Sequence, residues 1–203
     1  MEMEKSASSK MTTVNVELKL QDHSGGGSSS ATIAVTVDQK AHECVRHLKT
    51  PVFQESVTKM GPSGGSGGSN RDMDMRGVNR IVKVLVRHGH AIDAISFQFE
   101  RNGQEEWSGD WGGRGGVLSE IHLGQDEYLI SVKGHVGSFL FVTCLKSLTF
   151  VSNLRSYGPY GVEDGMPFTL AAAPGGKILG FHGRSWWLLD AIGIYVKTGN
   201  WYA

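Results

Sequence analysis

The stretch GFHGRSWWLLDAIGIYVK, residues 180–197, contains the clearest sign of how the chain folds. Its segment LDAIGIYV, residues 189–196, resembles two earlier segments, IDAISFQF at residues 92–99 and LKSLTFVS at residues 145–152. The first and third segments share Asp-Ala-Ile at the same offset, and the three recur at spacings of about 45 to 53 residues. Such a period is typical of an internal structural repeat.

The residues around these segments recur as well. EEWSGDWGG follows the first segment and RSYGPYGV follows the second, while KGHVGS and LGFHGR precede the second and the third. The alternative is a chance similarity of strand composition, but the shared flanks favour a true repeat. One unit of this length could not bury its apolar face alone, so we expect three antiparallel units to pack about a pseudo-threefold axis.

From Val78 onward, apolar and polar residues alternate in short runs, such as NRIVKVLVRHG at residues 79–89 and SFLFVTCLKSLTFVSN at residues 138–153. This period of two predicts β-strands. The chain has 28 glycines in 203 residues, nearly twice the average of ~7%. Glycine, Asn-Gly or proline separates the runs, which predicts an all-β sandwich, barrel or prism.

Residues 1–58 differ from the rest of the chain. Two alternating runs, TVNVELKL at residues 13–20 and ATIAVTVDQ at residues 31–39, flank a Gly/Ser-rich segment that predicts a flexible connection. KAHECVRHLKT, residues 40–50, is compatible with a short helix that Pro51 ends. We therefore expect an N-terminal extension of unknown role over residues 1–58 and one domain over residues 59–203.

Charge and composition exclude several classes of protein. Twenty basic residues cancel twenty acidic ones, so no nucleic-acid or membrane-surface partner is expected. No apolar run approaches the roughly 20 residues that span a bilayer, which predicts no membrane insertion. The N-terminus lacks a secretory signal, which predicts a cytoplasmic or nucleocytoplasmic protein. Cys44 and Cys144 are accordingly expected to be buried free thiols.

No catalytic, metal or cofactor constellation is evident, so we expect no enzyme. Ser185 lies near His182 and Asp190 in the sequence, but no nucleophile-elbow pattern surrounds it. The histidines beyond residue 60 lack the spacing of zinc ligands and are expected in turns or on the surface. They are His88, His90, His122, His135 and His182.

Sugar recognition fits residues 180–197 better than catalysis does. A carboxylate such as that of Asp190 accepts hydrogen bonds from neighbouring hydroxyls, backbone amides donate to sugar oxygens, and an aromatic face covers the apolar side of a pyranose. The alternative is that Trp186 and Trp187 belong to the core and Asp190 caps a turn. The residues alone leave both interpretations open.

The motifs together resemble the jacalin-related lectins. GFHGRSWWLLDAIGIY, residues 180–195, is similar to the family's C-terminal signature, and residues 145–170 resemble the segment before it, including the YGPYG turn. KMGPSGGSGGSNRDM, residues 59–73, resembles the family's glycine-rich opening. The resemblance covers about residues 59–197 and implies a β-prism of three four-stranded Greek-key sheets with pseudo-threefold symmetry.

The resemblance also implies where a sugar would bind. The Asp190 carboxylate and the Gly68 amide would contact the sugar, so Gly64–Asp72 is expected to be a folded loop and only Gly61–Ser63 a linker. Trp186 stands where the family usually has glycine, so a positive φ there would strain it, and its ring would either fill the site or line it. The remaining implied positions are the amides of Trp187 and Leu188, with Val142 and Thr143 at the side.

The same resemblance suggests a biological role. It implies mannose/glucose-type glycans as partners, an uncleaved chain, dimers or tetramers, and a function in plant defence or stress response. A phosphate-binding loop is excluded at residues 60–72 because no Lys follows the glycines and two carboxylates do. The alternative function is a scaffold on the same fold, with a sugar site impaired by Trp186.

Overall fold

The computed structural model describes residues 11–20, 29–38 and 52–202, and the chain divides into two compact units. The first unit contains β1 (Met11–Leu20) and β2 (Ser29–Asp38), which pair antiparallel from Met11 opposite Asp38 to Leu20 opposite Ser29. Both predicted N-terminal strands are therefore confirmed. The short helix predicted over residues 40–50, and Cys44 within it, lie outside the described residues.

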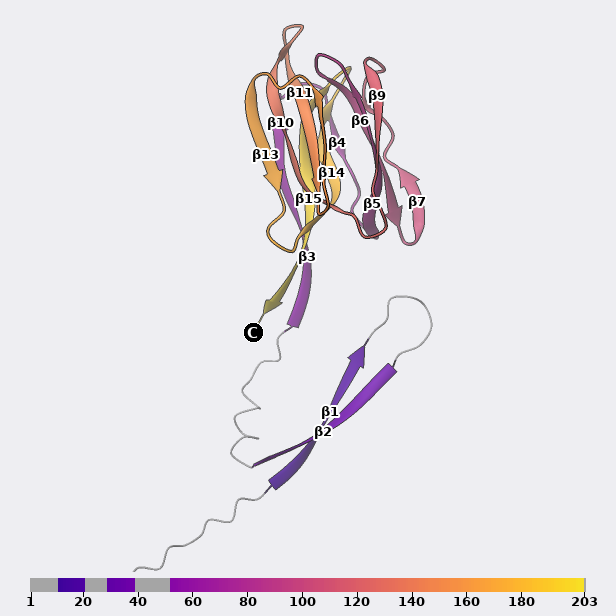
Figure 1. The fold of residues 1–203 in the computed structure, drawn as a ribbon, viewed down its shortest axis with the longest axis vertical. Helices are drawn as coiled ribbons and strands as arrows, with labels where there is room; N and C mark the ends of the chain where they lie inside the picture. The colour runs from indigo at the N-terminus through magenta and orange to yellow at the C-terminus, as the bar shows by residue number, and fades with distance from the viewer. Residues whose placement is uncertain (1–10, 21–28, 39–51, 203) are drawn as a thin grey trace, which may run out of the picture. The chain divides into compact units, whose positions relative to one another are not determined.

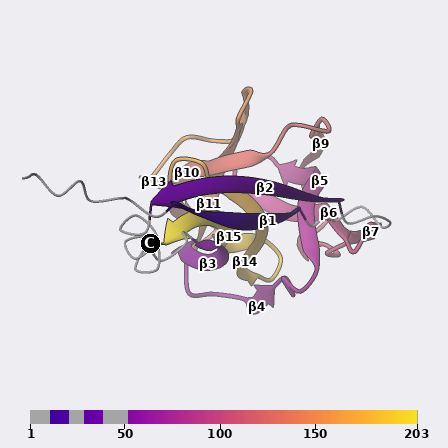
Figure 2. The same ribbon diagram turned by 90° about the horizontal axis from the view of Figure 1, so that it is seen from below.

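The second unit, Phe53–Asn200, contains three antiparallel sheets. Their strand orders are β3-β15-β14-β4, β7-β6-β5-β9 and β12-β11-β10-β13, and Figure 1 and Figure 2 show the sheets on different sides of one core. The strands are β3 (Val52–Gly64), β4 (Ser69–Asp72), β5 (Val78–His88), β6 (Ile92–Arg101), β7 (Gln104–Trp107), β8 (Trp111–Gly112), β9 (Val117–His122), β10 (Leu129–Phe139), β11 (Val142–Ser152), β12 (Ser156–Gly161), β13 (Met166–Ala171), β14 (Lys177–Ser185) and β15 (Leu189–Tyr202).

In two sheets, three consecutive strands lie side by side and a fourth strand returns to lie beside the first, which is the Greek-key order. The sheet of β3, β15, β14 and β4 is assembled from both ends of the domain. The predicted prism of three four-stranded sheets is confirmed, with one addition: the two-residue strand β8 pairs with β6 and makes that sheet five-stranded. Among the described residues there is no helix that could span a membrane.

The predicted repeat segments become β6, β11 and β15, one in each sheet. In each repeat, the N–H of a loop residue donates to the backbone carbonyl of the second residue of its segment. The three hydrogen bonds run from Gly113 to Asp93 (3.0 Å), from Val162 to Lys146 (2.9 Å) and from Gly65 to Asp190 (2.8 Å). The repeat inferred from sequence is therefore a repeat of backbone geometry.

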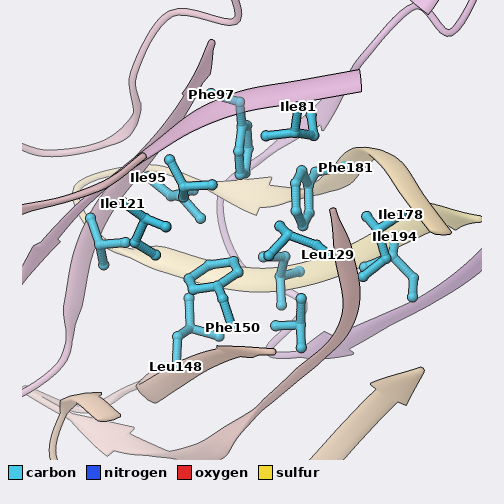
Figure 3. Close-up of a cluster of buried hydrophobic side chains, with 14 of the residues drawn as sticks. Ile81, Ile95, Phe97, Ile121, Leu129, Leu148, Phe150, Ile178, Phe181 and Ile194 are labelled. Atoms are coloured by element: carbon cyan, nitrogen blue, oxygen red, sulfur yellow. The ribbon is translucent and has the colours of Figure 1, made fainter. Parts of the chain in front are cut away.

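The core lies where the three sheets meet. Phe97, Phe150 and Phe181 come from three different sheets and are fully buried. Phe97 stacks on Phe181 with ring centroids 4.0 Å apart, and Phe150 meets Phe181 edge-on at 6.3 Å, as Figure 3 shows. Burial of each such ring contributes roughly 1.5–3 kcal/mol, so these aromatic contacts hold the sheets together.

A smaller cluster joins three hairpins at one end of the prism, called here the hairpin end. Ala91, Cys144 and Leu188 are buried together, one from each of the hairpins β5–β6, β10–β11 and β14–β15. Phe139 and Val142 pack against them. Cys144 is a buried free thiol, as predicted.

Three sequence interpretations need correction. Gly61–Ser63 is not a linker but part of β3, because Gly61 packs so closely that a Cβ there would lie 3.1 Å from the Gly193 Cα. His182 is not on the surface; it is 4% exposed. Residues 138–153 are not one uninterrupted strand, because β10 turns into β11 at Leu140 and Phe141.

Candidate functional site

Two segments from opposite ends of the domain meet at the hairpin end. β4 pairs with β14, which places Ser69 opposite Ser185. The Gly65 N–H then donates to the Asp190 carbonyl, as described above. The predicted meeting of the glycine-rich loop with the Asp190 loop is therefore what the structure shows.

The Asp190 carboxylate is buried and incompletely bonded. The residue is only 5% exposed, and its Oδ2 is the one buried side-chain polar atom without a partner among the described residues. A buried acceptor without a donor is costly and rare in folded proteins, so Oδ2 is suited to accept a hydrogen bond from a ligand.

Gly67 and Gly68 form a backbone cradle against this carboxylate. A Cβ on Gly67 would lie 2.9 Å from Asp190 Oδ1, and one on Gly68 would lie 2.4 Å from Oδ2. Gly68 also has φ +61°, a conformation that side chains disfavour. Only glycine lets the loop backbone approach the carboxylate this closely.

Burial raises the pKa of the Asp190 carboxyl, whereas the nearby backbone N–H of Trp186 and the charge of Arg184 oppose the shift. Arg184 also holds the cradle directly. Its Nε donates to the Gly67 carbonyl (2.6 Å), its Nη2 to the Gly68 carbonyl (2.7 Å) and its Nη1 to Asn70 Oδ1. The C=O and N–H groups of a trans peptide point in opposite directions. The hydrogen bonds from Arg184 to the Gly67 and Gly68 carbonyls therefore turn the N–H groups of the same two peptide units away from Arg184.

Trp186 does not obstruct this arrangement. Positive φ at non-glycine residues is confined, in the described part of the chain, to Asn102, Leu140 and Phe141, so Trp186 is not strained. Its side chain is 74% exposed, and Trp187 is 39% exposed. The ring therefore projects into solvent at the rim instead of filling the space beside Asp190.

The other predicted residues lie around the same site. The Leu188 side chain is buried in the hairpin-end cluster, and its carbonyl accepts a hydrogen bond from the Trp186 N–H (3.1 Å). Val142 packs on that cluster, while the Thr143 carbonyl would lie 2.2 Å from a Cβ on Gly65. The β10–β11 hairpin thus borders the glycine loop, and direct contact of these residues with a ligand remains a prediction.

A second candidate site surrounds Asp93, a half-buried aspartate that also faces two glycines. A Cβ on Gly115 would lie 2.3 Å from Asp93 Oδ1, and one on Gly116 would lie 2.5 Å from Oδ2. Burial raises the pKa of this carboxyl too. A Cβ on Gly113 would lie 2.5 Å from the Trp187 carbonyl, so the tryptophan hairpin borders the Asp93 site.

The sequence interpretation missed this second site, although two signals for it exist. Residues 89–93, GHAID, have the Gly-x-x-x-Asp spacing that the Asp190 loop lacks, and WGGRGG at residues 111–116 parallels SGGSGG at residues 63–68. Arg184 was missed as well, because no spacing rule indicates which way its side chain points.

Comparison with known proteins identifies the family to which the chain belongs. Residues 60–195 match the family model of the jacalin-like lectin domain. The chain belongs to the jacalin-like lectin family. Jacalin-related lectin 3 of Arabidopsis thaliana is 42% identical over 142 residues, which are 68% of this chain but only 23% of that protein. Horcolin of Hordeum vulgare is 38% identical and covers 68% of this chain and 95% of its own length.

Solved structures of jacalin-related lectins share this prism. A mannose-binding lectin from Ananas comosus has a TM-score of 0.65 and 41% identity, over 69% of this chain and 96% of that one. The Calsepa lectin of Calystegia sepium, in complex with a biantennary N-glycan, has a TM-score of 0.61 and 33% identity, over 73% of this chain and 98% of that one. The resemblance inferred from the motifs is confirmed.

The middle repeat of this jacalin-like domain, which contains residues 145–152, departs from the other two. Lys146 occupies the position of Asp93 and Asp190, and its Nζ lies 5.2 Å from the centroid of the Phe139 ring. Its loop has Val162, Glu163 and Asp164 where the others are glycine-rich. This repeat therefore offers neither the carboxylate nor the open backbone of the other two.

The residues considered for catalysis are bonded elsewhere. Ser185 Oγ accepts a hydrogen bond from Arg71 Nε (2.8 Å), and His182 Nε2 donates to the Met60 carbonyl (2.9 Å). Ser185, His182 and Asp190 thus do not form a hydrogen-bonded triad. Among the described residues, no group of His, Cys, Asp and Glu is arranged to hold a metal ion.

A cavity of about 500 Å³ lies at the opposite end of the prism, between the starts of β5, β10 and β14. Its buried carboxylate, Glu127, already accepts hydrogen bonds from Ser152, Tyr157 and Arg155. Burial opposes ionisation of Glu127, but these bonds lower its pKa to about 2. The Asp190 end, with its unpartnered acceptor, is therefore the better candidate for a binding site.

Proposed function

We propose that this jacalin-like domain binds mannose/glucose-type glycans without catalysing a reaction. The observation that carries the proposal is the buried, unpartnered Asp190 Oδ2 within the cradle of Gly67 and Gly68. The mannose-binding relative from Ananas comosus supports the choice of sugar class. Neighbouring hydroxyls of a pyranose would donate to the ionised carboxylate, which is a strong charge-assisted acceptor.

The other groups would orient the sugar. The cradle lets backbone N–H groups approach sugar oxygens closely, and Arg184 fixes the peptide planes of the cradle. Trp186 and Trp187 supply exposed indole faces for the apolar side of a ring. Because the contacts are few and the rings open to solvent, we expect weak affinity for one sugar unit.

The Asp93 site would bind a second sugar by the same chemistry, since its carboxylate and glycines repeat the geometry of the first site. One chain would then be bivalent. Linking two weak sites raises the affinity for a glycan or glycosylated surface that can engage both, without any new contact.

The scaffold alternative depended on Trp186 impairing the sugar site. The exposure of its ring and its ordinary φ do not favour such an impairment. The cytoplasmic or nucleocytoplasmic location, the dimers or tetramers and the role in plant defence or stress response remain proposals. Light scattering of the full chain would test the assembly, and imaging of a tagged chain would test the location.

Calorimetric titration of methyl α-mannoside against the full chain tests the proposed sites. We expect two sites in the wild type, one in Asp190→Ala, one in Asp93→Ala and none in the double variant. Asp164→Ala is the matched control, because Asp164 is an exposed carboxylate in the equivalent loop of the middle repeat. Absence of binding in the wild type, or a preference for galactosides, would refute the proposal.

A further inference from the structure

The cavity of about 500 Å³ opposite the hairpin end, called here the distal cavity, has an apolar floor. The floor consists of the buried side chains of Ile81, Leu129, Ile178 and Leu179. Ile81, Leu129 and Ile178 belong to the main core, and Figure 3 shows them around the ring of Phe181. Ligand pockets have volumes of ~300–1,000 Å³ and mainly apolar walls, so the distal cavity has the size and the floor of a small-molecule site.

All three repeats have the same backbone irregularity at this end of the prism. In the pairings of β5 with β6, β10 with β11 and β14 with β15, one residue of the first strand is extra: Asn79, Ile130 and Leu179. Two residues opposite one are the count of a β-bulge, which bends a strand and is common at barrel rims and beside active sites. Asn79 and Leu179 line the distal cavity, so the bulges belong to the backbone that shapes it.

Arg80 brings a cation to the cavity in one repeat only. It follows the extra residue of β5, where the other two repeats have Ser131 and Gly180. The repeated backbone therefore does not require an arginine at this position. Arg80 Nη2 donates to the carbonyls of Gly124 (2.6 Å) and Leu123 (3.4 Å). Within the described part of the chain, its Nε and Nη1 have no partner and no carboxylate forms an ion pair with it.

The charged side chains that line the cavity leave one positive charge in excess. Two are cations, Arg80 and Lys177, and two are carboxylates, Asp126 and Glu127. Glu127 forms an ion pair with Arg155 (3.3 Å), which lies outside the lining. Asp126 can therefore balance only one of the two lining cations. One carboxylate on a ligand would balance the other, and a guanidinium binds a carboxylate through two parallel hydrogen bonds.

The floor determines the rest of the ligand. Its four aliphatic side chains have no hydrogen-bond donor or acceptor, so a ligand rich in hydroxyls would lose hydrogen bonds there, whereas an apolar body would not. We propose that the distal cavity binds a small carboxylic acid with an apolar body, the carboxylate on Arg80 and the body on the floor. This site lies at the other end of the prism from Asp190 and does not depend on the proposed glycan binding.

NMR titrations of the full chain with phenylacetate and phenylacetamide, observed at the methyl groups, test the proposal. Phenylacetate should shift the methyl resonances of Ile81, Leu129 and Ile178 and leave those of Leu188, at the hairpin end, unchanged. The amide has the same ring without the charge. Because a hydrogen bond to a charged group is worth about tenfold or more in affinity, the acid should bind about tenfold more tightly. Its affinity should be the same in the presence of methyl α-mannoside.

Arg80→Gln should lose the preference for the acid and keep its affinity for the amide. Arg101→Gln is the matched control and should keep the preference, because Arg101 also donates to backbone carbonyls, those of Arg76 and Asp74, but lies outside the cavity. Equal affinities of the wild type for acid and amide would overturn the inference, whether or not a variant folds well. So would an Arg80→Gln variant that keeps the preference, or resonance shifts confined to the hairpin end.

Discussion

Gly68→Ala tests the cradle most directly. A left-handed φ costs an L-residue roughly 1–2 kcal/mol, and Gly68 has φ +61°. The new Cβ would also lie 2.4 Å from Asp190 Oδ2 and 2.5 Å from the Ser185 carbonyl carbon. Because one of these neighbours is backbone, relief requires a shift of the loop, and such overpacking costs a further ~1–3 kcal/mol. We therefore expect a total loss of about 2–5 kcal/mol in the free energy of unfolding.

Gly175→Ala is the matched control. Gly175 has φ +80° but nothing within 4 Å of its Cβ position, so only the backbone cost of roughly 1–2 kcal/mol should appear. Thermal unfolding measures stability, and at about 2–4 °C per kcal/mol the two variants should be distinguishable. Calorimetry should show that Gly68→Ala loses the Asp190 site while Gly175→Ala keeps it. If Gly68→Ala is no less stable than the control and still fills both sites, the cradle has no role in binding.

Three further variants each test the role of one side chain. Arg184→Lys should weaken sugar binding about five- to tenfold in calorimetry, because an ammonium cannot replace all three guanidinium hydrogen bonds. Asp190→Asn should abolish binding at its site yet raise the urea midpoint of unfolding at neutral pH. Because the pKa of Asp190 is raised in the fold, ionisation of the carboxyl destabilises the fold as the pH rises above 3.8. The gain in stability of the asparagine variant should therefore vanish in acid. Glu127→Gln should cost roughly 1–3 kcal/mol at neutral pH, and urea unfolding should show the difference fading between pH 4.5 and about 2.

The repeat was the most informative feature of the sequence. Its segments have strand-length alternation and matching flanks, so residues 92–99, 145–152 and 189–196 could be assigned equivalent places before any register was known. The structure confirms this with equivalent backbone hydrogen bonds in the three repeats. Backbone periodicity was predictable because it depends on many residues at once.

The turn at Leu140 and Phe141 could not be predicted for the opposite reason. Its two residues lie within the continuous apolar run of residues 139–142, and no Gly, Asn or Asp interrupts that run. His182 was misplaced because it is buried through one specific partner, the Met60 carbonyl, which is 122 residues away. Contacts that depend on a single distant partner leave no local pattern.

Only some residues of the candidate binding site could be predicted from the sequence. Asp190 and Gly68 were found through the motifs that carry the family resemblance, and the structure brings their loops together. The Asp93 site has a motif of only five residues, GHAID, which is too short to stand out without the register that sets Gly115 and Gly116 against the carboxylate. Side-chain directions, such as that of Arg184, follow from packing that the sequence does not display.

Backbone symmetry by itself does not make a binding site in this fold. All three repeats keep the loop-to-strand hydrogen bond, including the one from Val162 to Lys146. The middle repeat nevertheless has a lysine for the aspartate, and it has Val162 and Asp164 where the other two loops have glycine. Restoring the carboxylate with Lys146→Asp would therefore not create a third site, because Asp164 would place a second negative charge and a side chain where the other loops have Gly67 and Gly115. A binding site in this fold needs both the aspartate carboxylate and the glycine-rich loop. The backbone of the prism only brings the two close together.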